Sequence, residues 1–214
     1  RTQTFLKNEN FEFTYKLDIQ VKDASYASSK IGLQPGAENI VFWWTVSNSK
    51  NQYVPYNKGG VFRKWYGNNF WYLRYGKDGD YLKSKNISLT NEKNHFQEHI
   101  SWTRVSSKLN MRFYSSEFLW DNTSPGVFND LPGFLAFFNS NVGEFIRRLK
   151  YRGNKIESGQ INGLPCAGIR LKSVVEVSGH NIHISKNDWN SRETSWDFEQ
   201  SPLLNQSQNI EASF

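Results

Sequence analysis

The spacing of apolar residues changes near residue 130, and this change constrains the fold more than any other feature of the sequence. Asp130 is a suitable N-cap, Pro132 is tolerated in a first helical turn, and Gly153 follows the last periodic residue. The sequence therefore predicts one long packed helix over residues 131–150. Its apolar residues recur at helical intervals and are Phe134, Leu135, Phe138, Val142, Phe145, Ile146 and Leu149.

Before residue 130 the apolar runs are short and rich in β-branched and aromatic residues, which is typical of strands. Together, the predicted strands and the predicted helix indicate an α+β fold, with a twisted mixed or antiparallel β-sheet and one long packed helix. The first run is predicted to be a buried strand, and the turn GNN predicts a hairpin between the second and third. These runs are residues 40–46, 61–66, 70–75, 100–106 and 109–115.

The 214 residues are enough for one domain with a sizeable core. We expect a lead-in segment over 1–29, the main domain over 30–183 and a C-terminal spacer or tail over 184–214. Because the chain begins with Arg1 and its only methionine is Met111, we expect a piece of a longer protein. The segment 169–177 fits a strand or a helix face.

The single cysteine excludes an internal disulfide framework and suits a reducing, cytoplasmic location. No apolar run approaches the roughly 18 residues that indicate a membrane helix. We therefore expect a cytoplasmic protein without a membrane partner.

Residues 56–76 read YNKGGVFRKWYGNNFWYLRYG and interleave cations with aromatic rings, without any Asp or Glu. Lysine and arginine neutralise phosphates and release counterions, and planar rings stack on bases. The pair Gly59-Gly60 allows a backbone to come close to a phosphate. The formal net charge of +6 also favours a polyanionic partner. The stretch therefore indicates a nucleic-acid-binding surface.

A structural interpretation of the same residues stays open. Alternate residues of a strand face opposite ways, so aromatic rings would fill the core while the cations stay solvated.

A second basic group, Arg104, Lys108 and Arg112, would extend the surface if its predicted strands pair with the hairpin. A third group compensates the dipole at the end of the predicted helix and consists of Arg147, Arg148, Lys150 and Arg152.

The motifs of several catalytic classes are absent from the sequence. It contains no Walker A loop, no G-x-G-x-x-G and no Asn/Asp-Pro-Pro-aromatic loop of the kind that grips a flipped adenine. Two histidine pairs and the single cysteine lack companion ligands, so we expect no metal site. The acidic group at 78–83 is typical of a solvated glycine-rich loop. We expect no catalytic residue and no cofactor in this chain.

Several phrases together resemble a family of bacterial adenine-specific DNA methyltransferases. PYNKGGVFRKWYGN (55–68) resembles the NKGG-x-FRKWYGN signature of the PglX-like enzymes of BREX phage defence and of related type IIG restriction-modification enzymes. Further phrases resemble segments of that family in the same order over residues 30–204. They are GLQPGAENIVF (32–42), HISWTRVSS (99–107), FLAFFNSNVGEFI (134–146), GQINGLP (159–165) and ISKNDWNSRETSWDFEQSPLL (184–204).

The resemblance implies a target-recognition (specificity) domain of the TaqI-like C-terminal type. Such a domain reads a short site in double-stranded DNA and presents its adenine for base flipping. S-adenosylmethionine is expected in the missing catalytic domain of the parent chain, which would be a partner together with other defence proteins. The family pattern also favours a helix around 169–183. Glu38 and Cys166 depart from the family pattern, and the acidic Glu38 argues against a phosphate role for loop 32–39.

The charge pattern and the resemblance together nominate DNA contacts. In them, cations would neutralise phosphates, asparagine amides would meet adenine edges and glycines would shape the backbone. An alternative function is a stand-alone single-stranded nucleic-acid or carbohydrate binding module with aromatic platforms, and a third is a protein-docking scaffold. The nominated DNA contacts are Asn57, Lys58, Gly59, Gly60, Arg63, Lys64, Asn68, Arg74, Arg104, Lys108 and Arg112.

Overall fold

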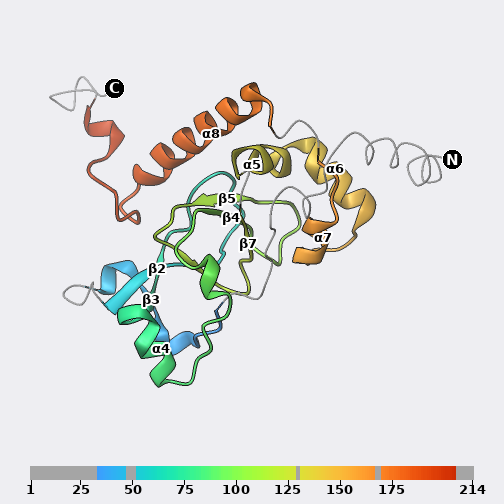
Figure 1. The fold of residues 1–214 in the computed structure, drawn as a ribbon. Helices are drawn as coiled ribbons and strands as arrows, with labels where there is room; N and C mark the ends of the chain where they lie inside the picture. The colour runs from blue at the N-terminus through green and yellow to red at the C-terminus, as the bar shows by residue number, and fades with distance from the viewer. Residues whose placement is uncertain (1–32, 47–51, 129–130, 167–169, 206–214) are drawn as a thin grey trace.

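The computed structural model describes residues 33–46, 52–128, 131–166 and 170–205 as two small β-sheets with helices around them (Figure 1). The fold class is therefore α+β, as the sequence predicts. The helices are α4 (Asp80–Ser84), α5 (Leu131–Asn139), α6 (Asn141–Lys150), α7 (Ser158–Asn162) and α8 (Lys172–Asn190). Short 3-10 turns span Ala37–Asn39, Trp43–Thr45, Lys77–Gly79, Glu92–Asn94 and Pro202–Asn205.

The first sheet is mixed and has the strand order β1-β3-β2-β6. β1 (Ile40–Phe42) and β2 (Tyr53–Asn57) pair antiparallel with the two sides of β3 (Trp71–Arg74), and β6 (Leu119–Trp120) runs parallel to β2. Pro55 is tolerated in the inner strand β2 because β6 pairs only with the last two residues of that strand. This proline obscured β2 in the sequence.

The second sheet is antiparallel and has the strand order β5-β4-β7. Its strands are β4 (His99–Ser101), β5 (Arg112–Tyr114) and β7 (Gly126–Val127). The predicted pairing of the runs at 100–106 and 109–115 is confirmed, although the strands are shorter than the runs.

Each sheet has its own buried core. In the second, α5 packs on β4 and β5 and separates them from α8, which forms the outer layer (Figure 1). The first core consists of Leu33, Tyr56, Leu73, Tyr75, Leu82 and Leu119. The second core includes Ile100, Trp102, Leu109, Met111, Val127, Phe134, Leu135, Phe138, Ile156, Ile161 and Leu164.

The prediction of one long helix over 131–150 is wrong, because the chain bends between α5 and α6. Ser140 has an extended backbone and caps α6, where its Oγ accepts a hydrogen bond from the Gly143 amide at 3.0 Å. Gly143 lies so close to α5 that a Cβ there would be 2.2 Å from the Phe137 carbonyl oxygen. Apolar residues keep helical spacing on both sides of the bend, so periodicity conceals it.

The predicted hairpin of 61–66 with 70–75 is also wrong. Only its second half forms a strand, β3, and the partners of that strand are β1 and β2. The run at 40–46 is a strand only over β1, which lies at a sheet edge, and Trp44 just beyond it is 49% exposed. The expectation of a buried strand there is therefore wrong, because a short apolar run does not show which neighbours cover it.

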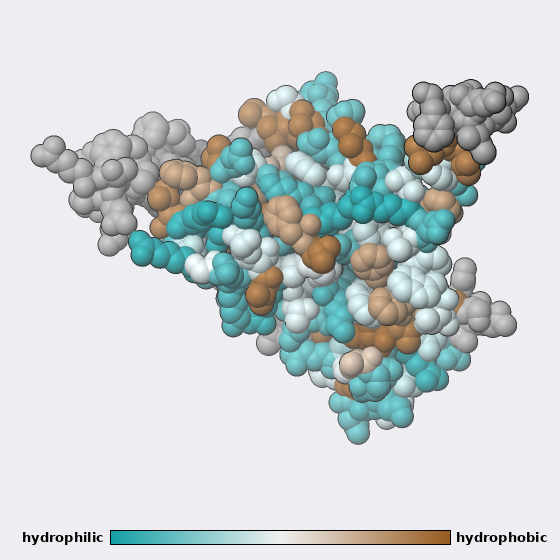
Figure 2. All heavy atoms as spheres, turned by 180° about the vertical axis from the view of Figure 1, so that it is seen from behind, coloured by the Kyte–Doolittle hydropathy of each residue, from teal (hydrophilic) through white to brown (hydrophobic). Residues whose placement is uncertain are grey.

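The ambiguous segment 169–177 is helical from residue 172 onward, where α8 begins. The predicted boundary after residue 183 falls inside this helix, and the predicted lead-in 1–29 lies outside the described residues. Apolar side chains lie along the upper rim of the molecule seen from behind (Figure 2). The exposed apolar residues of α8 include Val175, Val177 and Ile184. Among the described helices, none combines the length and apolarity needed to cross a bilayer.

Candidate nucleic-acid interface

Residues 58–64 follow β2 and form a loop that we call the β2 loop. Asn57, at the end of β2, is fully buried, and its Oδ1 accepts hydrogen bonds from the Gly59 amide (3.0 Å) and from Ser124 Oγ (2.7 Å). The side chain nominated to meet adenine therefore orients the start of the loop. Its Nδ2 makes no hydrogen bond within the described residues, and a base contact there stays a prediction.

Two side chains from other parts of the chain hold the backbone of the β2 loop. Thr103 Oγ1 donates to the Gly60 carbonyl at 2.9 Å, and Asn68 Nδ2 donates to the Val61 carbonyl at 2.9 Å. Gly59 and Gly60 have φ of 78° and 123°, and a Cβ on Gly60 would lie 2.9 Å from Asn68 Nδ2. The glycine pair is therefore required by the turn itself, and only Gly60 is exposed.

Arg112 lies underneath the β2 loop and is fully buried. Its guanidinium donates to the carbonyls of Arg63 (3.2 Å) and Asn110 (3.1 Å), and to the hydroxyls of Tyr114 (3.0 Å) and Thr103 (3.2 Å). No carboxylate of the described residues forms an ion pair with it. Arg112 thus fixes the loop and keeps an unneutralised positive charge beneath it, because arginine stays protonated in proteins.

Trp65 links the end of the β2 loop to the second sheet. Its amide donates to the Met111 carbonyl and its carbonyl accepts from the Phe113 amide, both at 2.8 Å, which gives a parallel bridge to Arg112. The stretch 56–76 and the second basic group are therefore neighbours, but through one bridged residue and not through paired strands.

Arg63 and Lys64 point from the loop to the helices. Arg63 forms an ion pair with Asp188 of α8 at 2.6 Å, and its guanidinium lies 5.1 Å from the centroid of the Trp189 ring. Lys64 Nζ donates to the Asn139 carbonyl at the end of α5 at 2.7 Å. Burial lowers the pKa of Lys64. Both cations therefore fasten the loop to α8 and α5.

An exposed aromatic stack borders the β2 loop. Trp71 of β3 stacks on Phe42 of β1 at 4.2 Å between ring centroids, and Phe42 stacks on Trp44 at 4.4 Å. The ammonium of Lys58, which is half-buried, lies 5.1 Å from the centroid of the Trp71 ring. A cation beside stacked rings suits binding of bases or of other planar groups.

The outermost side chains of the β2 loop are apolar. Val61 is 74% exposed and Phe62 is 54% exposed. Sequence reasoning nominated the cations on both sides of this pair and missed the pair itself. The signal that could have found it is two apolar residues directly after a glycine pair in a turn.

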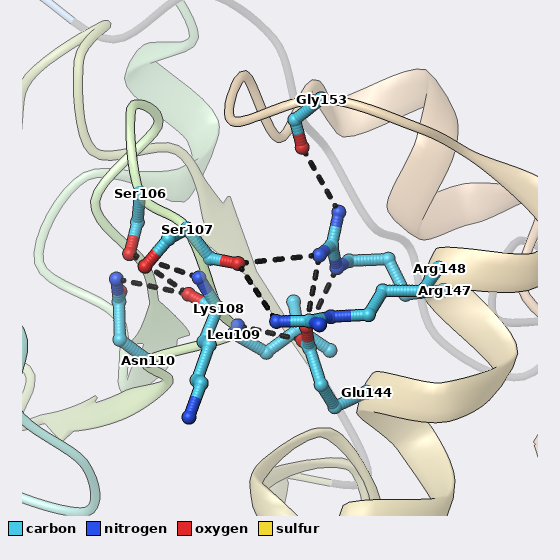
Figure 3. A network of polar contacts seen from close by, with 9 residues as sticks. All are labelled: Ser106, Ser107, Lys108, Leu109, Asn110, Glu144, Arg147, Arg148 and Gly153. Carbon is cyan, nitrogen blue, oxygen red and sulfur yellow. Dashed lines mark hydrogen bonds and ion pairs between the residues drawn. The ribbon is translucent and has the colours of Figure 1, made fainter.

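A second loop, residues 105–110, is held by α6 through a polar network (Figure 3). Glu144 accepts hydrogen bonds from the Leu109 amide (2.9 Å), from Arg147 (2.8 Å) and from Arg148 (2.5 Å). Burial alone would raise the pKa of Glu144, but these hydrogen bonds, above all that of Arg147, outweigh burial and lower the pKa to about 2. Arg147 and Arg148 of the third basic group therefore pair with a carboxylate, and they also lie in the last turn of α6, where the sequence indicated compensation of the helix dipole.

The polar network leaves Lys108 on the outside of the loop. Both arginines of the network also donate to the Ser107 carbonyl, while the Lys108 side chain is exposed and points away (Figure 3). Burial is the largest cause of the lowered pKa of Lys64. The charge of Glu144 raises this pKa and the charge of Lys108 lowers it, so the ammonium groups of Lys64 and Lys108 are close enough to repel each other. The 105–110 loop thus brings a second cation towards the β2 loop.

The remaining nominated arginines also have partners. Arg104 forms two hydrogen bonds to Glu157, both at 2.9 Å. The Arg74 guanidinium lies 4.1 Å from the centroid of the Tyr81 ring, at the end of β3 away from the β2 loop. Arg104 directly precedes the 105–110 loop, and its contact with DNA stays a prediction.

The structure thus brings most of the nominated residues together, but mainly as the framework of a loop. Nominated residues at the β2 loop are Asn57, Lys58, Gly59, Gly60, Arg63, Lys64, Asn68 and Arg112. Lys108 and Arg104 belong to the neighbouring segment 104–110, whereas Arg74 lies at the far end of β3. Among the described residues, no group of three or more His, Cys, Asp or Glu side chains is arranged to hold a metal ion.

Two curated proteins resemble the chain. It is 36% identical over 165 residues to the adenine-specific methyltransferase PglX of Lacticaseibacillus casei (strain Zhang), a match that covers 71% of this chain and 14% of that protein. It is 31% identical over 176 residues to the adenine-specific methyltransferase BrxX of Escherichia coli O9:H4 (strain HS), with 79% and 14% covered. No family model matches the chain. The chain is therefore related to these methyltransferases and spans 14% of the length of each.

Proposed function

We propose that this chain is the DNA target-recognition part of a longer bacterial adenine-specific (N6) DNA methyltransferase of phage defence or restriction-modification. The observation that carries the proposal is the similarity of most of the chain to one short part of two adenine-specific methyltransferases. We further propose that the part is a TaqI-like specificity domain. Neither relative is described as a single-strand or carbohydrate binding module, so the comparisons do not favour that alternative.

The β2 loop and the 105–110 loop are the proposed contact surface for double-stranded DNA. Lys58 and Lys108 carry the accessible cations of this surface and would neutralise phosphates. Arg112 supports them from below, since its charge is not neutralised by a carboxylate of the described residues. A positive potential of this kind attracts DNA over several ångströms even when the cation itself is buried.

Catalysis belongs, in this proposal, to the remainder of the parent polypeptide. We assign S-adenosylmethionine and the methyl-transfer step to a catalytic domain outside this chain, and we assign neither a cofactor nor a catalytic residue to the chain itself. The catalytic domain and other defence proteins are the proposed protein partners.

The experiment that tests the proposal measures binding of a labelled duplex by fluorescence anisotropy at several salt concentrations. The duplex contains a site at which the full-length parent enzyme methylates adenine, as found by sequencing DNA that it has modified. We expect the logarithm of the binding constant to fall with the logarithm of the salt concentration by about 0.9 for each phosphate contact. Absence of duplex binding would contradict the proposal.

The obvious double variant, Arg63→Ala with Lys64→Ala, is a poor test of DNA contact. Both side chains hold the loop to the helices, so their removal disturbs the loop whether or not DNA binds there. Methylation by the full-length enzyme with Lys58→Ala and Lys108→Ala is the better test. Lys172→Ala is the matched control, because Lys172 is an exposed lysine on α8.

A further inference from the structure

Side chains hold several backbone groups of the β2 loop, and the loop exposes two apolar side chains. The Gly59 amide, the carbonyls of Gly60 and Val61, and the carbonyl of Arg63 each bond to a side chain. At the tip, Val61 and Phe62 remain largely exposed. A loop held at these backbone groups around two exposed apolar residues is suited to present them to a partner.

The support makes the tip a rigid projection. Its backbone is held from below by the buried Asn57 and Arg112, and from the side by Thr103 and Asn68. Positive φ at both glycines sets the direction in which the chain leaves β2. A rigid apolar tip loses little conformational entropy when it enters a narrow space.

The charges around the tip distinguish between possible partners. Lys58, Lys64 and Arg112 surround its base, and none of them forms an ion pair with a carboxylate of the described residues. The core of an apolar protein interface is depleted of lysine, since the desolvation of its charge is costly. Apolar side chains between cations match DNA instead, in which stacked bases lie between two rows of phosphates.

We propose that Val61 and Phe62 form a wedge that enters between stacked base pairs of duplex DNA. This inference rests on the proposed DNA-recognition function and adds a mechanical role to it. Phenylalanine and other apolar side chains can part a base step and kink the duplex, while nearby cations hold the backbone. Flexible pyrimidine–purine steps are the preferred substrates, because they unstack most easily.

A wedge also suits an enzyme that methylates adenine inside a duplex. Such an enzyme must take the base out of the stack, and this costs unstacking and unpairing energy. A recognition part that already opens a base step would lower the remaining cost for the catalytic domain. The loop would then both locate and prepare the site.

The test compares two duplexes that differ only in one unpaired adenine at the centre. We expect the unchanged chain to bind the duplex with the unpaired adenine about tenfold more tightly, because part of the unstacking has been done already. Phe62→Ala should abolish this preference, and Phe62→Leu should retain most of it. In addition, 2-aminopurine placed in the central step should brighten on binding of the unchanged chain and stay dim with Phe62→Ala.

The matched control is Phe145→Ala, which removes an aromatic ring of similar exposure, 58%, from α6. It should leave both affinities and the brightening unchanged. Equal binding of the two duplexes, with no brightening, would overturn the wedge while leaving the proposed function in place. Failure to bind either duplex would overturn both. If Phe62→Ala weakened both affinities equally, Phe62 would be an ordinary contact and the wedge would also be wrong.

Discussion

The β2 loop and the polar network of Glu144, Arg147 and Arg148, which we call the α6 network, are both held by arginines, yet the guanidinium groups meet different acceptors. In the α6 network, Arg147 and Arg148 share the carboxylate of Glu144 (Figure 3). Beneath the β2 loop, Arg112 bonds to backbone carbonyls and hydroxyls. Arg63 is intermediate, because it bonds to the Tyr66 carbonyl and pairs with one carboxylate.

This difference decides how much positive charge remains for a partner. A carboxylate cancels the charge of the arginine that it binds, whereas a carbonyl or hydroxyl satisfies the hydrogen bonds and leaves the net charge in place. In the α6 network, the Glu144 carboxylate offsets one of the two arginine charges, whereas Arg112 keeps its whole charge beneath the β2 loop. Sequence spacing alone does not separate these two uses of arginine.

The largest expected effect comes from Arg112→Ala. Its removal leaves buried acceptors of Arg63, Asn110 and Tyr114 without their donor, at a cost of about 3–5 kcal/mol in unfolding free energy. Urea unfolding measures this loss. Arg152→Ala, at an exposed arginine, should change the unfolding free energy by less than about 0.5 kcal/mol. If the two variants were equally stable, the framework role of Arg112 would be refuted.

Glu144→Gln tests the carboxylate that holds the α6 network together. It weakens the acceptor shared by Arg147, which is almost fully buried, and we expect a loss of about 2–3 kcal/mol at neutral pH. Because hydrogen bonds from the arginines and from the Leu109 amide hold the pKa of Glu144 near 2, below its ordinary 4.5, the unfolded chain takes up this proton first as pH falls.

The stability contributed by Glu144 should therefore be complete above pH 4.5 and decline as pH falls towards 2. Thermal unfolding across this range should show a steeper acid loss for the unchanged chain than for Glu144→Gln. Parallel curves would mean that this carboxylate does not supply the acid sensitivity. Such a result would remove the electrostatic distinction between the two regions.

A smaller effect is expected where the β2 loop meets α8. Arg63→Ala removes the ion pair with Asp188 and the contact with the Trp189 ring, and should cost about 1–2 kcal/mol. Asp188→Asn should cost about 0.5–1 kcal/mol, since this carboxylate is half-exposed and the pair is screened. A double-mutant cycle by urea unfolding separates the pair from the ring contact. Additive losses would show that the two side chains are not coupled.

The smallest effect on stability, close to zero, is expected for Lys58→Ala and Lys108→Ala. Each should instead weaken duplex binding severalfold and reduce the salt slope by about one unit, as expected for one lost phosphate contact. The same titration on Lys172→Ala serves as the reference. A variant that lost stability without a change in salt slope would move its lysine from the DNA surface to the framework.

The sequence alone predicted the α+β class, the pairing of the runs that contain β4 and β5, and the cationic character of the region around the β2 loop. These features follow from composition and from regular spacing over several residues, which local physics determines. The ordered family phrases also led to the relationship that the two methyltransferases support.

Only the tertiary structure decided which strands pair, where the helix bends and which side chains are buried. The bend at Ser140 depends on the close approach of Gly143 to α5. β3 pairs with β1 and β2 instead of with residues 61–66. Arg112 is buried because distant segments converge on it, and Val61 and Phe62 are exposed because none of the described segments covers them. Such outcomes depend on contacts between residues far apart in the chain, and local spacing carries no record of these contacts.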